Sequence, residues 1–195
     1  MASDTDGFEE LTLHSEPAFS GNLLRLRIDT VRLPDGGKAT REIVQHPGAV
    51  AIVPVTADGQ LLMVRQWRHP VAKVTLEIPA GTLTPGESPE RCAQRELVEE
   101  VGYFPGQLDK LTTVLVSPGY SDETIHIFMA RQLQHQGRQP HPQADVSWAP
   151  DPDENVHLAT VPLRKAVALC TQGAIADAKS VAGILLAWER LQGRP

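Results

Sequence analysis

This chain of 195 residues has little cysteine and no long hydrophobic run, and both shortages narrow what it can be. Only Cys92 and Cys170 are present, which excludes a disulfide framework and suits a reducing cytoplasm. The longest apolar run near the C-terminal end, residues 181–188, is far shorter than the roughly 20 residues of a membrane-spanning helix. The first residues lack the basic and apolar regions of a secretion signal. We therefore expect a cytoplasmic protein that does not associate with a membrane.

Several familiar signatures are also missing. The formal net charge of −6 argues against a nucleic-acid scaffold, because binding to a polyphosphate backbone relies on lysine and arginine. The seven histidines show no zinc-binding spacing. Neither a P-loop, nor a Rossmann glycine pattern, nor Gly-x-Ser-x-Gly occurs. A small anionic substrate is still compatible with the negative charge, since a bound metal ion would offset it.

The alternation of apolar and turn-forming segments predicts strands followed by helices. Strands are expected at residues 11–20, 22–32, 38–45, 49–54, 61–66, 75–79, 111–117 and 124–132, and two late helices at 163–172 and 177–192. Residues 1–8 are expected to be loose, and residues 135–155, rich in Pro, Gln and Asp, to form a mobile surface loop. Periodicity alone leaves the fold class open between α/β and α+β.

A short helix is expected between Ser88 and Gly102. Ser88 suits the N-cap, and Pro89 suits the first helical position, where its missing N–H costs nothing. Gly102 can adopt the left-handed conformation that ends a helix. The buried stripe is expected to consist of residues at i+4 spacing, Ala93, Leu97 and Val101.

Three glutamates lie on one turn of this helix: Glu96, Glu99 and Glu100. Their i, i+3, i+4 spacing places the carboxylates on one face, where like charges destabilise an isolated helix. Hard divalent ions bind through clustered carboxylates and substrate phosphates. The cluster therefore predicts a metal-dependent site for a phosphate compound. The alternative is a solvated acidic helix whose charges are balanced by local ion pairs, Arg95 with Glu99 and Glu87 with Arg91.

The segment from Gly81 to Tyr103, GTLTPGESPERCAQRELVEEVGY, resembles the Nudix box, Gly-x5-Glu-x7-Arg-Glu-aliphatic-x-Glu-Glu-x-Gly-aliphatic. Tyr103 departs from the pattern, being aromatic where an aliphatic residue is usual. Further segments are similar to the ADP-ribose pyrophosphatases of this family, at residues 41–55, 61–70, 76–81, 117–123 and 175–180, and Pro118 follows the last box glycine at the spacing of that group. The resemblance implies the Nudix α/β/α sandwich with a mixed sheet. The alternating segments before residue 46, with the turn signal at 34–37, predict an N-terminal antiparallel β subdomain ahead of it.

The resemblance also implies an activity and a metal site. The expected reaction is hydrolysis of ADP-ribose to AMP and ribose 5-phosphate with Mg²⁺, or with Mn²⁺ in its place. The implied metal ligands are the backbone carbonyl of Ala80 with Glu96, Glu99 and Glu100, and these glutamates with Glu123 are the catalytic residues. Another nucleoside diphosphate sugar such as GDP-mannose is one alternative, and a non-catalytic ADP-ribose sensor is another.

Substrate contacts are implied at Arg68, Leu83, Ser117 and Gly119. The counterpart of Arg68 contacts the diphosphate, which a guanidinium binds through bidentate hydrogen bonds; the alternative is a surface arginine paired with a carboxylate. Glu123, in the loop 117–123, is implied to orient or deprotonate the attacking water, although Asp122 is adjacent and a solvent-facing loop acid is the alternative.

The N-terminal region is expected to serve dimerisation. We expect residues 1–46 to form a β subdomain and residues 47–195 the Nudix catalytic domain. The resemblance implies that the N-terminal region is exchanged between protomers. The resemblance implies that Arg41 and Glu42 frame the adenine, with exposed strand residues as the alternative. A homodimer is expected because the apolar hairpin at about 22–45 needs a surface to pack on.

Overall fold

The computed structural model describes residues 7–137, 141–145, 148 and 155–193. Chain contacts divide it into two compact units, residues 1–47 with 115–124, and residues 48–114 with 125–195. Most of the expected loose N-terminus, residues 1–6, and parts of the expected mobile loop, 138–140, 146–147 and 149–154, lie outside the described residues.

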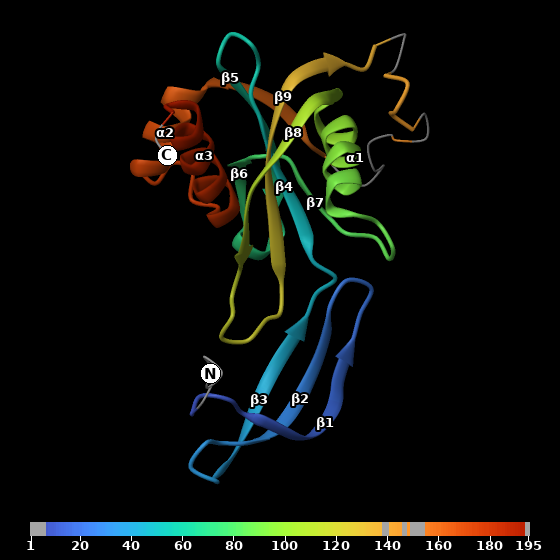
Figure 1. The fold of residues 1–195 in the computed structure, drawn as a ribbon, viewed down its shortest axis with the longest axis vertical. Coiled ribbons are helices and arrows are strands. Elements are labelled where there is room, and N and C mark those ends of the chain that lie inside the picture. Colours follow the sequence, from blue (N-terminus) through green and yellow to red (C-terminus); the bar gives the residue numbers. More distant parts are fainter. Residues whose placement is uncertain (1–6, 138–140, 146–147, 149–154, 194–195) are drawn as a thin grey trace. The chain divides into compact units, whose positions relative to one another are not determined.

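The first unit is built on a three-stranded antiparallel sheet in the order β1-β2-β3. Its strands are β1 (Leu11–Ser20), β2 (Arg25–Arg32) and β3 (Lys38–Gln45), drawn in blue in Figure 1. The turn at residues 34–37 joins the last two, with Leu33 N–H donating to the Gly37 carbonyl at 2.8 Å. All residues of β1 are exposed, so this strand buries no side chain within the unit.

The second unit contains two sheets. A mixed sheet has the order β7-β4-β9-β8, with β4 (Ala49–Pro54) and β9 (Thr124–His135) parallel and β7 (Ala80–Thr82) antiparallel to β4. Its other member is β8 (Tyr103–Leu115). An antiparallel sheet has the order β10-β5-β6, from β5 (Gln60–Arg68), β6 (Lys73–Glu77) and β10 (His157–Pro162). A short 3₁₀ turn, η1 (His69–Val71), joins β5 to β6.

Helices cover both faces of the mixed sheet. Because side chains alternate along β4, Val50 and Ile52 pack with α1 (Pro89–Val101), whereas Ala51 and Val53 pack with α2 (Leu163–Thr171) and α3 (Ala178–Leu191). Figure 1 shows α1 on one side of the strands and α2 and α3 on the other. Every residue of β4 is buried, as expected of a strand covered on both faces. The architecture is therefore the predicted α/β/α sandwich with a mixed sheet, and an antiparallel β unit precedes it.

The sequence predicted several elements closely and missed others. Strands β3 and β4 and the two late helices lie where they were expected, within a residue at each end. The strand expected at 111–117 is longer and begins at Tyr103, and β7 and β10 were not predicted. None of the described helices combines the length and the hydrophobicity needed to cross a bilayer.

Candidate functional site

Helix α1 begins and ends as its sequence predicts. The Ser88 hydroxyl accepts a hydrogen bond from the Arg91 backbone N–H at 3.3 Å, which satisfies one of the donors left free at a helix start. Gly102 ends the helix with φ of 78°, and its N–H donates to the Val98 carbonyl at 2.9 Å. The expected buried stripe is confirmed, since Ala93, Leu97 and Val101 are all buried. This stripe fixes the direction in which the acidic residues project.

Arg95 lies at the centre of the acidic cluster. Its Nη1 donates to Glu96 Oε1 at 2.7 Å and to Glu99 Oε2 at 2.8 Å. Its Nε and Nη2 donate to the two carboxylate oxygens of Glu87, each at 3.0 Å. One guanidinium therefore contacts three carboxylates, and its positive charge reduces the repulsion between Glu96 and Glu99 on one face of α1.

The ion pairs predicted from the sequence for this helix were partly right. Arg95 contacts Glu99 as the i,i+4 spacing indicated. Glu87 pairs with Arg95 instead of Arg91, whose guanidinium lies 3.6 Å from Asp145 and 5.2 Å from the ring of Trp148. Hydrogen bonds from Arg95 lower the pKa of Glu87 to about 2 although burial opposes this shift, and the pKa of Arg95 is raised in turn. The pair therefore stays ionised at neutral pH.

The segment after β6 brings backbone groups to this helix. The Ala80 N–H donates to Glu100 Oε2 at 3.0 Å. At Gly81, a Cβ atom would lie 1.8 Å from the Glu96 carboxyl carbon, so the carboxylate occupies the space that any other residue would fill. The structure thus brings together all four residues predicted as metal ligands, Ala80, Glu96, Glu99 and Glu100.

These groups fit a hard divalent cation by their chemistry. Carboxylate and backbone carbonyl oxygens are the ligands that Mg²⁺ and Mn²⁺ prefer. Among the residues that the structure describes, no three carboxylate, imidazole or thiolate side chains converge as a ready metal cage. Glu96 and Glu99 instead point their oxygens at Arg95. The metal ligand assignment stays a prediction.

Two predicted substrate residues belong to this same unit. Arg68, the last residue of β5, donates from Nε and Nη2 to the carboxylate of Glu77, at 2.9 and 2.7 Å. The alternative considered for Arg68, a pairing with a carboxylate, is therefore present, and its side chain is still 41% exposed. Leu83 is half-buried against the α1 side of the core, and its N–H donates to the Gly48 carbonyl at 3.1 Å.

Three other predicted residues, Ser117, Gly119 and Glu123, lie in the loop of the first unit. The Ser117 carbonyl accepts from Ser121 N–H at 2.9 Å, and Val44 N–H in β3 donates to the Tyr120 carbonyl at 2.8 Å. This loop is hydrogen-bonded to β3 rather than hanging free. The sequence had indicated no such link.

The loop acids differ in their contacts. The Asp122 carboxylate accepts from the His46 backbone N–H at 2.9 Å. A carboxylate oxygen of Glu123 lies 3.9 Å from His46 Nδ1, and the Glu123 side chain is 28% exposed. The Asp122 carboxylate therefore holds the backbone at His46 although the residue is exposed, whereas Glu123 is half-buried beside the His46 ring.

Arg41 and Glu42 project to opposite faces of β3. In the register of β2 and β3, Arg41 is paired with Asp29 and Glu42 with Ile28, so the two side chains alternate across the sheet. Arg41 forms an ion pair with Glu10, whose hydrogen bond raises the arginine pKa. A ligand on one face of this sheet would meet only one of the two side chains.

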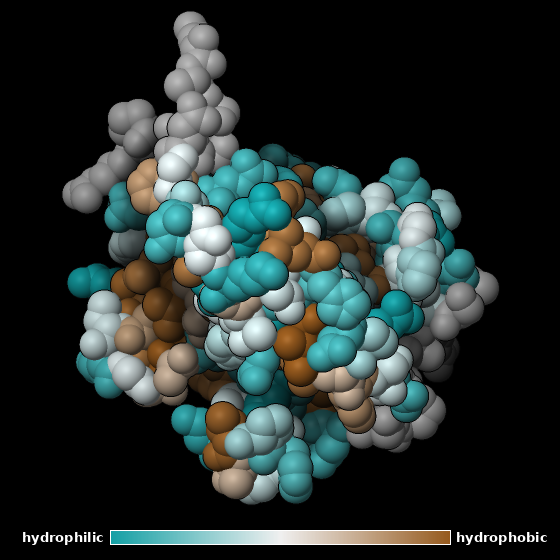
Figure 2. All heavy atoms as spheres, turned by 90° about the horizontal axis from the view of Figure 1, so that it is seen from below, coloured by the Kyte–Doolittle hydropathy of each residue, from teal (hydrophilic) through white to brown (hydrophobic). Residues whose placement is uncertain are grey.

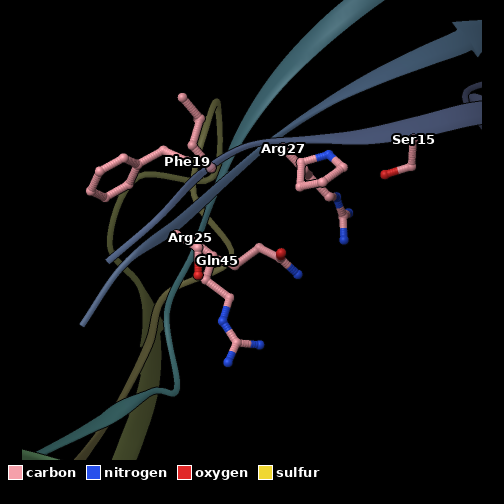
Figure 3. Close-up of a pocket in the computed structure, with 8 residues that line it drawn as sticks. Ser15, Phe19, Arg25, Arg27 and Gln45 are labelled. Carbon is pink, nitrogen blue, oxygen red and sulfur yellow. The ribbon is translucent and has the colours of Figure 1, made fainter. Parts of the chain in front are cut away.

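The first unit also carries a groove of about 450 Å³ that sequence reasoning did not find. Figure 3 shows its labelled lining residues, of which Arg25, Arg27 and Gln45 share one face of β2 and β3. The remaining lining includes Phe19 from β1. Phe19 is in register with Leu26, so its ring turns away from the two arginines, as Figure 3 shows. Arg27 forms an ion pair with Asp29. Two guanidinium groups on one face suit an anionic group chemically. The alternation of arginines at i,i+2 was the available signal.

The chain is similar to curated proteins over most of its length. It is 41% identical to ADP-ribose pyrophosphatase of Bacillus subtilis (strain 168), over 90% of this chain and 91% of that protein. It is 40% identical to the methanol dehydrogenase activator of Bacillus methanolicus, over 91% of each. Mycobacterium tuberculosis (strain ATCC 25618 / H37Rv) has an ADP-ribose pyrophosphatase at 37%, over 89% and 81%. A GDP-mannose pyrophosphatase of Pectobacterium atrosepticum is more distant, at 31% over 82% and 83%.

The fold and the family models agree with these likenesses. A crystal structure described as an ADP compounds hydrolase superposes with a TM-score of 0.75, covering 96% of this chain and 97% of that one, at 24% identity. Residues 10–44 match the nucleoside diphosphate sugar hydrolase N-terminal domain. Residues 45–183, which include the acidic helix and the Ala80–Gly81 segment, match the NUDIX domain. The chain therefore belongs to the Nudix family.

Proposed function

We propose that this protein hydrolyses the diphosphate bond of ADP-ribose, adding one water to give AMP and ribose 5-phosphate. The observation that carries the proposal is the packing of Glu96 and Glu100, from α1, against the Ala80–Gly81 segment. The likeness to two ADP-ribose pyrophosphatases over most of the chain supports the choice of substrate.

The residues of the site take distinct roles in this proposal. Glu96, Glu99, Glu100 and the Ala80 carbonyl would hold Mg²⁺ or Mn²⁺. When bound, such an ion supplies Lewis-acid polarisation of phosphoryl oxygens and lowers the pKa of water. Glu96 and Glu99 would then exchange the guanidinium of Arg95 for the ion, while Glu87 keeps Arg95 in place through its two hydrogen bonds.

Outside this cluster, Glu123 would orient or deprotonate the attacking water. The Asp122 carboxylate already accepts the His46 N–H, whereas the Glu123 carboxylate lies 3.9 Å from His46 Nδ1, which supports this role for Glu123 over Asp122. Arg68 would contact the diphosphate through the guanidinium nitrogen that Glu77 does not use. Leu83, Ser117 and Gly119 would line the substrate, and Arg41 or Glu42 would frame the adenine.

A panel of nucleoside diphosphate sugars tests the substrate. With Mg²⁺ present, we expect ADP-ribose to yield equimolar AMP and ribose 5-phosphate, faster than GDP-mannose yields GMP. Separation of the products by ion-exchange chromatography measures both. Rapid cleavage of GDP-mannose with ADP-ribose untouched would replace the proposed substrate, and ADP-ribose binding without cleavage by any metal-loaded sample would indicate a sensor.

We also propose a homodimer built through the N-terminal unit, with residues 1–46 as the dimerisation subdomain and 47–195 as the catalytic domain. The first unit exposes large apolar side chains that it does not cover itself, at Phe8 (83% exposed), Leu11, Phe19, Leu23 and Leu24. Figure 2 shows one face of the molecule, on which apolar side chains stand among hydrophilic ones. A second copy of the chain would bury such residues with a two-fold symmetric interface.

Mixing inactive chains tests whether a site is shared between protomers. We expect Arg41→Ala and Glu96→Gln chains, each impaired alone, to regain activity when co-expressed, because one site of the mixed dimer receives both intact halves. Sedimentation velocity establishes the oligomeric state of the same samples. A fully active monomer at assay concentration would contradict the dimer, and a dimer without recovery would contradict the sharing of residues.

The compartment we propose is the cytoplasm. Both cysteines are free, Cys92 fully buried and Cys170 half-buried, and burial raises the pKa of each thiol. Buried neutral thiols are stable without oxidation, which agrees with a reducing environment.

A further inference from the structure

Glu77 is a buried carboxylate to which the proposed reaction assigns no part. It is the last residue of β6 and only 2% exposed. It accepts hydrogen bonds from Arg68 Nε and Nη2, from the Thr75 hydroxyl at 2.6 Å and from Lys179 Nζ at 2.5 Å. An ionised carboxylate is costly at such a place unless it is paired and hydrogen-bonded. Although burial acts to raise it, these contacts lower the pKa of Glu77 to about 2.

The contact with Arg68 uses only one edge of the guanidinium. Nε and Nη2 form a two-pronged contact with Glu77, which fixes the plane and the direction of the group. Within the described residues, Nη1 of Arg68 has no hydrogen-bond partner, and the side chain is 41% exposed. The hydrogen bonds with Glu77 raise the pKa of Arg68, and the charges of Asp177 and Glu100 act in the same direction. Arg68 is thus held on one edge and open on another.

Lys179 joins this pair to the start of α3. Its side chain is 10% exposed, and Nζ lies 2.9 Å from Asp177 Oδ2 as well as close to Glu77. Asp177 is the N-cap of α3 and accepts from the Ser180 backbone N–H at 3.0 Å. The Ser180 hydroxyl accepts from Ile78 N–H at 2.9 Å, next to Glu77. The first turn of α3 is therefore bonded to the end of β6 through a continuous polar network.

The charges in this network have a consequence for Arg68. With Arg68 as its sole partner, Glu77 would cancel the guanidinium charge. Lys179 supplies a second positive charge to the same carboxylate, so part of the Arg68 charge stays available to an anion. Lys179 is shared with Asp177, which reduces the positive charge that it can offer to Glu77. The N-terminus of α3 also stabilises the Asp177 charge, so Asp177 does not depend on Lys179 alone.

We propose that Glu77 and Lys179 are positioning residues for Arg68: Glu77 holds the guanidinium in one orientation with Nη1 open to a diphosphate oxygen, and Lys179 balances the Glu77 charge from α3. This inference rests on the proposed function, since it takes the anion to be the substrate diphosphate. Segment 175–180 then contributes to substrate binding without touching the substrate.

A double-mutant cycle between Glu77 and Arg68 tests the proposal. We expect Glu77→Gln to lower kcat/KM for ADP-ribose by about 100-fold, because a misplaced contact group costs about that much. In an Arg68→Ala background, the same change should have no further effect, since the group it positions is gone. Independent, additive losses would overturn the proposal, because Glu77 would then act on something other than Arg68.

Lys179 gives a second arm with matched controls. Lys179→Met should raise KM on the order of tenfold, with little change in kcat. Losses of this size are common when a residue that supports a binding group is removed. Lys179→Arg should restore KM, because it keeps the positive charge. Lys165→Met, on the exposed face of α2, should behave as wild type. Thermal melting of each variant separates folding from function; a change in melting temperature with unchanged KM would overturn the role of Lys179.

NMR of the Arg68 Nε–Hε group measures positioning without any turnover. In the wild-type protein, we expect slow exchange of this proton with water and a shift of the resonance on adding inorganic pyrophosphate. Glu77→Gln should make the exchange fast. An Arg68 signal that is the same in both proteins would overturn the proposal. If the wild type cleaves no nucleoside diphosphate sugar while the NMR results hold, the proposed function fails and the positioning of Arg68 stands.

Discussion

Replacing Glu96 or Glu100 by glutamine is expected to lower kcat for ADP-ribose by at least about 100-fold. Metal ions contribute several kcal/mol to the stabilisation of transition-state charge, and each 1.4 kcal/mol or so corresponds to a tenfold change in rate. Each substitution removes one negative oxygen ligand and preserves side-chain volume. Glu96 is 8% exposed and Glu100 accepts the Ala80 N–H, so both carboxylates are held where the ion is expected.

Steady-state kinetics at saturating Mg²⁺ measures kcat, and calorimetric titration of Mn²⁺ into each variant measures metal affinity. Glu90→Gln is the matched control, because Glu90 is an exposed glutamate in the first turn of the same helix. It should retain wild-type kcat and metal affinity. Chelation with EDTA should abolish wild-type turnover, and added Mg²⁺ should restore it. Wild-type rates in both variants, or turnover that survives thorough chelation, would rule out the metal assignment.

Replacing Gly81 by alanine is expected to remove most activity with little change in stability. The new methyl group would lie 1.8 Å from the Glu96 carboxyl carbon, so the carboxylate has to leave its position. The atoms it meets form the end of a flexible side chain, so the clash can be relieved without moving backbone. The displaced Glu96 would also lose its 2.7 Å contact with Arg95. We expect kcat to fall by about 100-fold, as for a misplaced catalytic group.

The Gly81→Ala prediction has a stability readout and a control. Thermal unfolding should change by only a few degrees, since about 1 kcal/mol shifts the melting temperature of a domain this size by roughly 2–4 °C. Gly137→Ala, where the nearest atom to the added methyl group would be 3.6 Å away, should leave activity unchanged. Full activity in Gly81→Ala would show that Glu96 does not need this position. A large decrease in melting temperature would show that Gly81 is needed for the stability of the fold.

Rules that depend only on neighbouring residues predicted much of the fold. Ser88, Pro89 and Gly102 specified where α1 begins and ends, because capping depends on groups within a few residues of the helix termini. The i, i+3, i+4 spacing placed the three glutamates on one face before any packing was known. Strand β4 was predictable for a similar reason, since a continuous apolar run between turn signals matches a strand buried on both faces.

The same kind of local rule separates two of the predicted substrate residues. Arg41 and Glu42 are neighbours in a strand, so the alternation of side chains already indicates that they project to opposite faces. That both residues frame the adenine stays a prediction. The strand β10 (His157–Pro162) was missed because it gains its place by pairing with β5, which lies far earlier in the chain.

By itself, the sequence determined the acidic helix, the family resemblance and hence the class of chemistry, because these depend on spacing along the chain. Only the tertiary structure decided which partners the charges take: Glu87 for Arg95, and Glu77 for both Arg68 and Lys179. Lys179 is 102 positions away from Glu77. No local spacing relates such residues, because they meet only when the burial of apolar surface packs α3 against the strands.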